Sequence, residues 1–554
     1  MRRSRFFALV PVSFIVALIF SFFSPITVLK LAASVPLCSV FNLNSTLCMA
    51  NSVQELKPLM AVTAPVAEVA SADVSRSPRS TRFPNSLFPD CKLGDRLASL
   101  FRQKPDVSKL PPPAPAPDDS NFGANIQRTM TLLATSTPKH RHPVRILFYG
   151  QSITKQDWWK EVVNDLKKRF PYADLVVENR AIGAFAAPIL IRPAEHDLYP
   201  FYPDLTIFHV YGGHEEYEAI IANIRRRTTS EIAFHSDHVT WLPTGTNADD
   251  PEKLKAYQWH DYHSTEWLPE LASKYGSELI EIRQPWKQYL KDNKLQPKDL
   301  LSDDIHLNEG GNFVLANLVK RQLRYNSKFP TDSWKDMVKT YVVGTDVQWK
   351  DGKLVLEFEG NRIDAIATRS TDGNSTTAQV LIDGKKPSEF PELYTITRPS
   401  NAVGVDWPAI IQVSSQKPLI VEDWTARITE IDNKASVFKF EVFGSKTGFD
   451  GSGVSNETFV SNSGRVVIEP KNWWLENSRQ YSGKPTPKGF EIKWQVKPMF
   501  VDEYVTPKIE DESREYYTTL AQNLSNSKHT LELIPNKNGV VPIQSIRVYR
   551  PLLN

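Results

Sequence analysis

Cysteine is scarce in this sequence. The three cysteines, Cys38, Cys48 and Cys91, all precede residue 100 of the 554-residue chain. Everything after that point therefore lacks a thiol nucleophile and cannot hold a zinc ion through cysteine. In an oxidising compartment two of the three could form a disulfide, and the sequence does not select the pair.

An excess of charge of either sign is also missing. The 66 Lys and Arg residues nearly balance the 63 Asp and Glu residues, which gives a formal net charge of +3, and no dense basic stripe or internal repeat occurs. This pattern excludes a general nucleic-acid binder. Hydrophobic residues (41%) and charged residues (23%) are in the globular range, and the length predicts several domains.

No charged residue occurs between Phe6 and Leu29, and the basic sequence MRRSR precedes this segment. The apolar run is long enough to span a bilayer, and the positive charge before it places the N-terminus in the cytoplasm. Residues 1–34 are therefore predicted to be a signal anchor, that is, a transmembrane helix. A cleaved signal peptide is the alternative, because the small residues Ala32 and Ala33 follow. Both alternatives predict a secreted or membrane-anchored protein with its bulk outside the cytoplasm.

Sustained periodicity is missing from residues 35–140, which include KLPPPAPAPDDS. Proline and small polar residues at this density are typical of extended linkers. A Pro-rich, mostly disordered spacer is therefore predicted here, interrupted by a short helix around CKLGDRLASLFRQ.

Regular alternation begins after this segment, and residues 141–330 are predicted to form one α/β domain. The apolar strands VRILFY, DLVVEN, DLTIFHVY, EIAFHS and ELIEIR alternate with stretches of helical periodicity, from KQDWWKEVVNDLKKRF to GNFVLANLVKRQLRY. Near-continuous apolar strands indicate a parallel, doubly wound sheet with both faces covered. Such sheets bind ligands at the carboxyl ends of their strands.

Residues 331–554 show a different pattern, of short alternating strands separated by Gly, Asp and Asn turns. Eight such strands predict an all-β sandwich of the jelly-roll type. The segments GKLVLEFEGNRIDAIA, HTLELIPN and SIRVYR are predicted to open and close one sandwich, with an insertion between them. Such a domain could bind carbohydrate or cover a flank of the α/β domain.

Four polar loops follow strands of the α/β domain: GQSIT (150–154), NRAIG (179–183), YGGHEEYE (211–218) and SDDIHLNEGG (302–311). In a parallel sheet these loops gather at one edge. Together they supply a serine, backbone N–H groups beside glycines, a histidine donor and an Asp-x-x-His pair, which are the groups that acyl transfer needs. This chemistry requires no metal and no cofactor.

With these four loops in this order, the chain resembles the SGNH (GDSL-type) hydrolases, which are mostly esterases and lipases with a flavodoxin-like, three-layer α/β/α fold. The resemblance covers most of the α/β domain and is most specific in the fourth loop. It implies that Ser152 is the nucleophile, that His306 is the base and that Asp303 orients the base. It also implies an oxyanion hole made by Ser152, Gly183 and His214.

Two positions depart from the family pattern. Gln151 stands where the name motif has Asp, at a position outside the triad. His214 stands where the family has an oxyanion Asn, and a histidine donates in the required direction only in one tautomer or when charged. Glu215 and Glu216 are expected to favour the charged form. This predicts an activity that falls on the alkaline side faster than His306 alone would dictate.

Simpler roles compete with these assignments. Ser152 could be only a helix cap, Gly183 only a turn glycine, and His214 only a structural residue at a helix start. Asp303 and His306 could be loop-to-helix capping residues, and Asp304 could replace Asp303 as the residue that orients the base. One of the neighbouring residues Trp158 and Trp159 is predicted to be core, and the other to line the crevice for sugar stacking.

A metal site is a further alternative, because the α/β domain is rich in histidine. No H-x-x-x-H or H-E-x-x-H pair stands out in it, so the sequence does not favour this alternative. The histidines in question are His196, His209, His235, His238, His260 and His263.

The resemblance implies an extracytoplasmic serine esterase that hydrolyses acyl esters, acetyl esters above all, through an acyl-enzyme. Several carbohydrate esterases pair such a domain with a jelly-roll module, so an acylated polysaccharide or small molecule is the expected substrate. An O-acyltransferase would use the same triad and pass the acyl group to a glycan hydroxyl. A catalytically inactive glycan-binding protein would keep only the shell of the fold. No nucleic-acid partner is expected.

Overall fold

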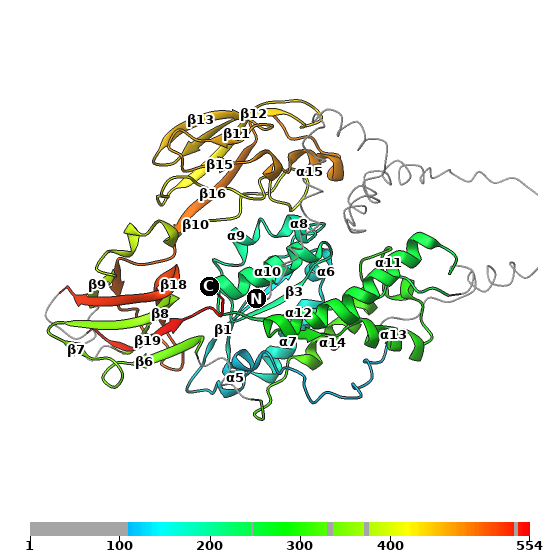
Figure 1. The fold of residues 1–554 in the computed structure, drawn as a ribbon, viewed down its shortest axis with the longest axis horizontal. Helices are drawn as coiled ribbons and strands as arrows, with labels where there is room; N and C mark the ends of the chain where they lie inside the picture. Colours follow the sequence, from blue (N-terminus) through cyan, green and yellow to red (C-terminus); the bar gives the residue numbers. More distant parts are fainter. Residues whose placement is uncertain (1–108, 245–247, 330–335, 370–375, 537–540, 554) are drawn as a thin grey trace, which may run out of the picture. The chain divides into compact units, whose positions relative to one another are not determined.

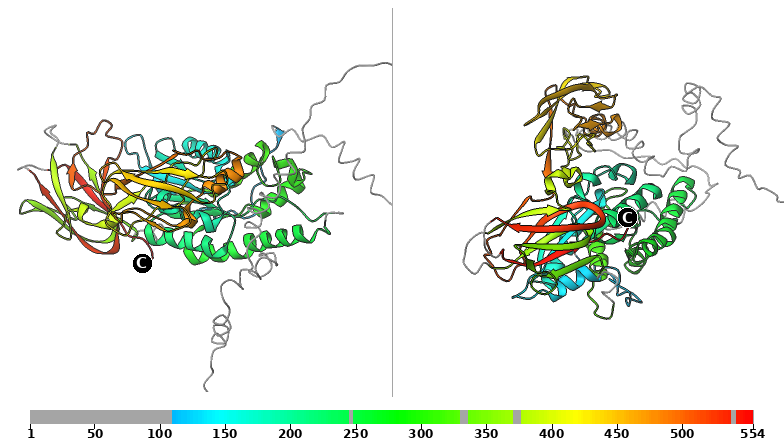
Figure 2. Two further views of the ribbon diagram at one scale, coloured as in Figure 1. Left: turned by 90° about the horizontal axis from the view of Figure 1, so that it is seen from above. Right: turned by 60° about the vertical axis from the view of Figure 1, so that its left-hand side comes forward.

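The computed structural model describes residues 109–244, 248–329, 336–369, 376–536 and 541–553. The described residues form an α/β unit and two antiparallel β regions (Figure 1, Figure 2). The predicted anchor or signal segment and most of the predicted linker lie outside them. Within the described part of the chain, no helix is both long enough and apolar enough to cross a membrane.

A five-stranded parallel sheet forms the centre of the α/β unit, with the strand order β2-β1-β3-β4-β5. This is the order of flavodoxin-like doubly wound folds. The strands are β1 (Pro143–Gly150), β2 (Asp174–Asn179), β3 (Leu205–His209), β4 (Glu231–His235) and β5 (Glu278–Ile280). The predicted parallel α/β fold is therefore confirmed.

Helices cover both faces of this sheet. Along β1, Ile146 and Phe148 pack into one core with α5, α7, α13 and α14, whereas Leu147 and Tyr149 pack into the other with α8, α9, α10 and α12. The α-helices are α5 (Gln127–Thr135), α6 (Ser152–Lys155), α7 (Trp158–Arg169), α8 (Ala187–Leu190), α9 (Ala194–Asp197), α10 (His214–Arg227), α11 (Pro251–Tyr262), α12 (Leu268–Tyr275), α13 (Arg283–Asp292) and α14 (Glu309–Gln322). A π turn, η5 (His263–Trp267), joins α11 to α12, and a 3-10 turn, η6 (Pro297–Leu300), precedes α14.

The α/β unit begins earlier than the boundary predicted at residue 141. Helix α5 lies within the predicted linker, yet Ile126 and Met130 are fully buried in the core beneath the sheet. Two buried carboxylates also hold this segment, because Glu278 and Glu231 accept hydrogen bonds from its backbone amides. A nine-residue helix directly after a Pro-rich stretch shows too few turns for its periodicity to be recognised in the sequence.

The first β region, here called the split β region, consists of two stretches of chain that are far apart in sequence. Strand β8 pairs with both β18 and β19, as expected for the opening and closing segments of one fold. Its strands are β6 (Val338–Val342), β7 (Trp349–Lys350), β8 (Lys353–Ala367), β9 (Thr377–Ile382), β17 (Glu503–Val505), β18 (Tyr517–Pro535) and β19 (Ile543–Tyr549), with the 3-10 turns η8 (Pro387–Glu389) and η9 (Pro391–Leu393) after β9.

The second β region, residues 394–498, is inserted between these two stretches and is called the inserted β region. Its sheet has the order β10-β16-β11-β12-β13, and it encloses a hydrophobic core separate from that of the split β region. Its elements are β10 (Tyr394–Ile396), β11 (Asp423–Ile431), β12 (Phe438–Gly444), β13 (Gly448–Val454), β14 (Phe459–Val460), β15 (Val467–Ile468), η10 (Pro470–Asn472), α15 (Leu475–Ser482) and β16 (Glu491–Pro498). The predicted all-β character of the C-terminal region is confirmed, and its apolar side chains divide between two cores.

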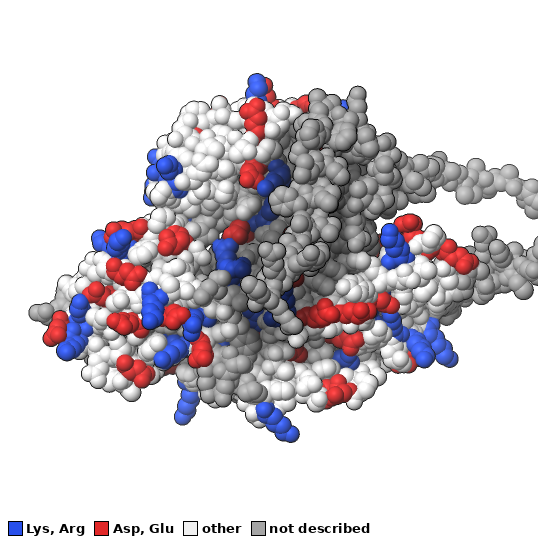
Figure 3. Space-filling model, in the orientation of Figure 1, with Lys and Arg blue, Asp and Glu red and all other residues white. Residues whose placement is uncertain are grey.

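The balanced composition is also visible on the surface. On the face shown in Figure 3, acidic and basic side chains are interspersed over both the β regions and the α/β unit. This distribution fits the small net charge of the sequence.

Candidate active site

Ser152 lies on a tight turn at the carboxyl end of β1. Gly150 passes so close to the carbonyl oxygen of His209 that a Cβ atom there would overlap it. The same oxygen accepts hydrogen bonds from the amide of Gln151 (3.3 Å) and the hydroxyl of Thr154 (3.2 Å). Gln151 is the N-cap of α6 and Ser152 its first helical residue, so Ser152 does not occupy the capping position. Its side chain is partly exposed.

Gly183 lies directly beside this serine. The amide of Ile182 donates to the carbonyl oxygen of Gly150 (2.9 Å), which fixes the second loop against the first. A Cβ atom built on Gly183 would stand 4.0 Å from the Cβ atom of Ser152. Gly183 is therefore a close neighbour of Ser152, and the role of the two backbone amides as oxyanion donors stays a prediction. Because α6 has only four residues, its dipole adds little to these local N–H groups.

Asp303 and His306 form the predicted carboxylate–imidazole pair. The Nδ1 atom of His306 donates to one oxygen of Asp303 (2.8 Å), and the other oxygen accepts the amides of Ile305 (2.8 Å) and His306 (2.7 Å). Partial burial raises the pKa of Asp303, but these hydrogen bonds outweigh it and hold the pKa below its ordinary value. The carboxylate thus selects the tautomer that leaves Nε2 free to accept a proton. Asp304 is exposed, and the bond to the imidazole comes from Asp303.

Two side chains that sequence reasoning missed hold the loop of His306 in place. Gln156, one helical turn after Ser152, donates to the carbonyl of Leu307 (2.8 Å) and accepts from its amide (3.0 Å). On the other side, the buried His238 donates from Nε2 to the carbonyl of Ile305 (2.9 Å). Burial lowers the pKa of His238 to about 4, so this histidine is neutral at physiological pH. No motif marks these partners, because they act only through the backbone of the loop.

His214 begins α10, and its side chain lies in a cluster of aromatic rings. It stacks on Trp267 with ring centroids 4.0 Å apart, and its Nε2 atom is hydrogen-bonded to Nδ1 of His263 (3.0 Å). Burial lowers the pKa of His214, which is opposite to the effect expected from Glu215 and Glu216. The expectation of a charged His214 is therefore wrong, because burial disfavours the charged form of the ring. Its role in the oxyanion hole stays a prediction, and only Nδ1 is left to serve it.

A second aspartate–histidine network lies beneath the nucleophile turn. Asp237 accepts hydrogen bonds from His209 (3.0 Å) and His260 (2.6 Å), and its side chain is 1% exposed. Burial alone would raise the pKa of Asp237, but the charge of His260 and these hydrogen bonds bring it well below the ordinary value. The ring of His235 stacks on that of His209 at 4.1 Å. Four of the histidines considered for a metal site thus have structural contacts beneath the site. Two bind Asp237, His235 stacks on one of these, and His238 holds the fourth loop.

Trp158 and Trp159 both pack against the core. Trp158 is fully buried, as predicted for one of the pair, and its indole donates to the carbonyl of Ile153 (2.6 Å). Trp159 is partly buried against the same core, with its ring 5.6 Å from that of Phe148. Core packing therefore accounts for both tryptophans.

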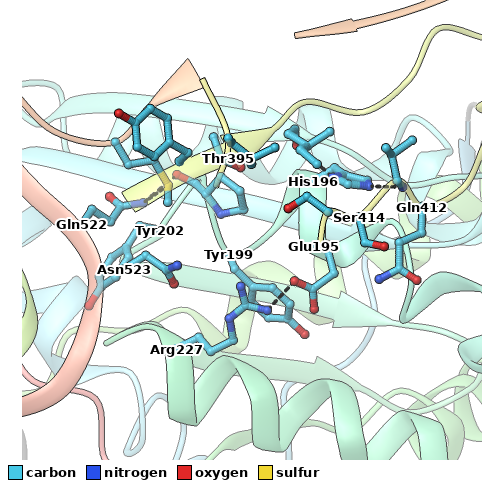
Figure 4. Close-up of a pocket in the computed structure, with 17 residues that line it drawn as sticks. Glu195, His196, Tyr199, Tyr202, Arg227, Thr395, Gln412, Ser414, Gln522 and Asn523 are labelled. Carbon is cyan, nitrogen blue, oxygen red and sulfur yellow. Dashed lines mark hydrogen bonds and ion pairs between the residues drawn. The ribbon is translucent and has the colours of Figure 1, made fainter. Parts of the chain in front are cut away.

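Two cavities lie away from Ser152, and neither Ser152, Gly183, His214, Asp303 nor His306 lines them. One, of about 230 Å³, lies where α9 and α10 meet β10 and β18 (Figure 4). In it Glu195 pairs with Arg227 (2.6 Å), and His196 bonds the backbone of Ile396 and Val413. The other, of about 300 Å³, is lined by Arg145 and other residues at the opposite, N-terminal end of β1. Sheets of this type bind ligands at the carboxyl ends of their strands, so the candidate active site is at Ser152.

Comparisons with known proteins give matches among solved structures. No protein-family model matches the chain, and no curated protein sequence matches it significantly. Among solved structures, the chain is similar to an acetylxylan esterase from Geobacillus stearothermophilus, with 18% identity and a TM-score of 0.29 over 34% of this chain and 97% of that one. It is also similar to a two-domain esterase active on acetylated mannans, with 13% identity and a TM-score of 0.30 over 78% of this chain and 96% of that one.

Proposed function

We propose that this protein is a serine esterase that removes acyl groups, acetyl above all, from an acylated carbohydrate. The observation that carries the proposal is the bonded pair of Asp303 and His306 on a loop that Gln156 ties to the helix of Ser152. A nucleophile, a base and a residue that orients the base are the minimum set for acyl transfer through a covalent intermediate.

The proposed reaction proceeds in two halves. The hydroxyl of Ser152 attacks the ester carbonyl carbon while Nε2 of His306 takes its proton, and the amides of Ser152 and Gly183 stabilise the oxyanion. The tetrahedral intermediate then expels the sugar hydroxyl, which receives the proton from His306, and the acyl-enzyme remains. Water attacks this ester with His306 again as base, which releases the carboxylic acid and restores Ser152. Asp303 stays ionised throughout and stabilises the imidazolium.

A polymer as substrate fits the exposure of the site. The side chains of Asp303 and His306 are 58% and 37% exposed, and Ser152 is partly exposed. A site that opens at the surface admits an ester on a long chain, whereas an enclosed pocket would select a small molecule. The apolar segment from Phe6 to Leu29 is the reason to propose action outside the cytoplasm, either secreted or anchored.

Acetate release from a panel of acetylated polysaccharides tests the proposal. We expect release by the wild type and none above background by Ser152→Ala. Labelling by an activated phosphonate ester should mark the wild type and not Ser152→Ala. Failure of both assays would favour the inactive glycan-binding alternative. Acetate transfer to an added unacetylated glycan, in place of release, would identify an acyltransferase.

A further inference from the structure

The inserted β region reaches the two loops that carry Ser152 and Gly183. Asp406 pairs with Lys155 at the end of the helix of Ser152. Arg398 donates to the carbonyl of Arg180 (2.8 Å), in the loop that leads to Gly183, and pairs with Asp197 (2.6 Å). These contacts hold the start of the inserted β region against the oxyanion side of the site.

Trp407 directly follows Asp406 in the sequence, and its indole lies beside Gly183. Its indole Nε1 atom lies 4.0 Å from the position that a Cβ atom of Gly183 would take, and the Cβ atom of Ser152 is at the same distance from that point. The indole Nε1 atom of Trp407 and the Cβ atom of Ser152 are therefore separated by at most twice this distance. The indole packs with Phe185 of the α/β unit (6.0 Å between ring centroids) and is 7% exposed.

A second aromatic residue extends this surface outward. Tyr481, in α15, contacts Trp407 with ring centroids 4.7 Å apart and is itself 52% exposed. The two residues thus combine an indole N–H group near Gly183 with a half-exposed tyrosine ring. Aromatic faces pack on the apolar face of a pyranose ring, and the polar edge donates to its hydroxyl groups.

We propose that Trp407 and Tyr481 form a binding platform for the sugar ring that carries the ester. The inserted β region thereby contributes to the active site and determines which alcohol portion of the ester is accepted. This inference rests on the proposed function for the identity of the ester. The binding of the sugar can nevertheless be measured without any turnover.

Variants of the two aromatic residues test the platform, with a matched control in the same β region. Tyr481→Ala removes the exposed ring, and Trp407→Phe keeps the packing but removes the N–H donor. Phe449, on β13, is 55% exposed and contacts Phe443, so Phe449→Ala removes a comparable exposed ring elsewhere. Each protein is assayed with acetylated xylo-, manno- and cello-oligosaccharides and with 4-nitrophenyl acetate, which lacks a sugar.

We expect Tyr481→Ala to lower kcat/KM for an acetylated oligosaccharide about tenfold, mainly through KM, and to leave hydrolysis of 4-nitrophenyl acetate within about twofold. Trp407→Phe should lower kcat/KM for the oligosaccharide, relative to that for 4-nitrophenyl acetate, about fivefold, since one hydrogen bond is lost. Phe449→Ala should resemble the wild type. Equal losses on both substrates, or a Tyr481→Ala protein that matches Phe449→Ala, would overturn the platform.

A binding measurement separates this inference from the proposed function. Calorimetric titration of the Ser152→Ala protein with the same oligosaccharides should show binding that the added Tyr481→Ala change weakens about tenfold. If Ser152→Ala still hydrolyses the ester, the proposed triad is wrong, while the titration still decides the platform. Absence of binding to all three oligosaccharides, or binding unaffected by Tyr481→Ala, overturns the platform even if the triad is correct.

Discussion

The α/β unit contains two aspartate–histidine arrangements, one exposed and one buried. In the exposed one, Asp303 binds a single imidazole and its second oxygen binds backbone amides. In the buried one, Asp237 gives one oxygen to His209 and the other to His260. The side chain of Asp303 is 58% exposed, and that of Asp237 is 1% exposed.

The difference teaches what makes such a pair suitable for catalysis. A base needs a ring nitrogen that can take the proton of the nucleophile, and Asp303 binds only Nδ1 of His306, which leaves Nε2 for this proposed role. In the buried network both oxygens of Asp237 bind imidazoles within the protein. Because His209 ends β3 and Asp237 follows β4, this network helps to position the two strands beneath the site. The same two residue types thus serve structure in the interior, and we propose that they serve chemistry at the surface.

The largest effect is expected at the exposed pair. His306→Asn should lower kcat about 10⁴-fold or more, because the serine loses its base, and Asp303→Asn should lower it about 10⁴-fold through the wrong tautomer. The side chains of Asp303 and His306 are 58% and 37% exposed, so the free energy of unfolding should change by less than about 1 kcal/mol. Steady-state kinetics and urea unfolding of the same samples provide the two measurements.

Asp304→Asn is the matched control for Asp303→Asn, since Asp304 is the exposed neighbour in the same loop. It should keep nearly full activity. A large loss of kcat in Asp304→Asn with little loss in Asp303→Asn would mean that Asp304, and not Asp303, orients His306 during the reaction.

The buried network should respond in the opposite way. Asp237→Asn replaces an acceptor of two hydrogen bonds by an amide that can accept only one of them, inside a core that excludes water. We expect a loss of about 3–5 kcal/mol in the free energy of unfolding, measured by urea denaturation. The folded fraction at low temperature should retain kcat within about tenfold, because the exposed pair is unchanged. Wild-type stability together with a collapse of kcat would instead give Asp237 a direct part in catalysis.

The sequence predicted the parts of the site that have their own chemical signature. Asp303 and His306 stand three residues apart, and the loop that contains them closes its own hydrogen bonds, so their pairing depends on local sequence. Gly150 and Gly183 follow apolar strands that are recognisable from composition alone. The parallel, doubly wound character of the sheet was predicted from the alternation of apolar strands with helical stretches.

The parts that could not be predicted depend on contacts between distant segments. Gln156 binds the backbone of Leu307, 151 positions away, and neither residue type indicates this contact in the sequence. Trp407 lies in the insertion predicted within the β-sandwich domain, and its place beside Gly183 depends on contacts such as those of Arg398 and Asp406 with distant loops. The pKa of His214 was misjudged because adjacent glutamates are visible in the sequence, whereas burial among aromatic rings is not.

A smaller effect is expected where the exposed pair is attached to the nucleophile helix. Gln156→Glu keeps the shape of the side chain but loses the donor to Leu307, so the loop of His306 should shift relative to Ser152. We expect kcat to fall about 10- to 100-fold with KM nearly unchanged, because positioning and not binding is affected. Asn317→Asp, an exposed amide that bonds within α14, is the control and should match the wild type. A change in KM alone would contradict a positioning role.

The smallest effect is expected at His214, and it concerns pH. Burial lowers the pKa of His214 below its ordinary value, so the ring is neutral at neutral pH and remains neutral as the pH rises. No charge is present to be lost on the alkaline side, and the alkaline limbs of the kcat profiles of His214→Asn and the wild type should coincide within about twofold. His140→Asn, at an exposed histidine before β1 and so at the opposite end of that strand from Ser152, supplies the control. An alkaline fall that is steeper in the wild type than in His214→Asn would mean that the oxyanion is held by a charged imidazole, and that the carboxylates of α10 outweigh burial during catalysis.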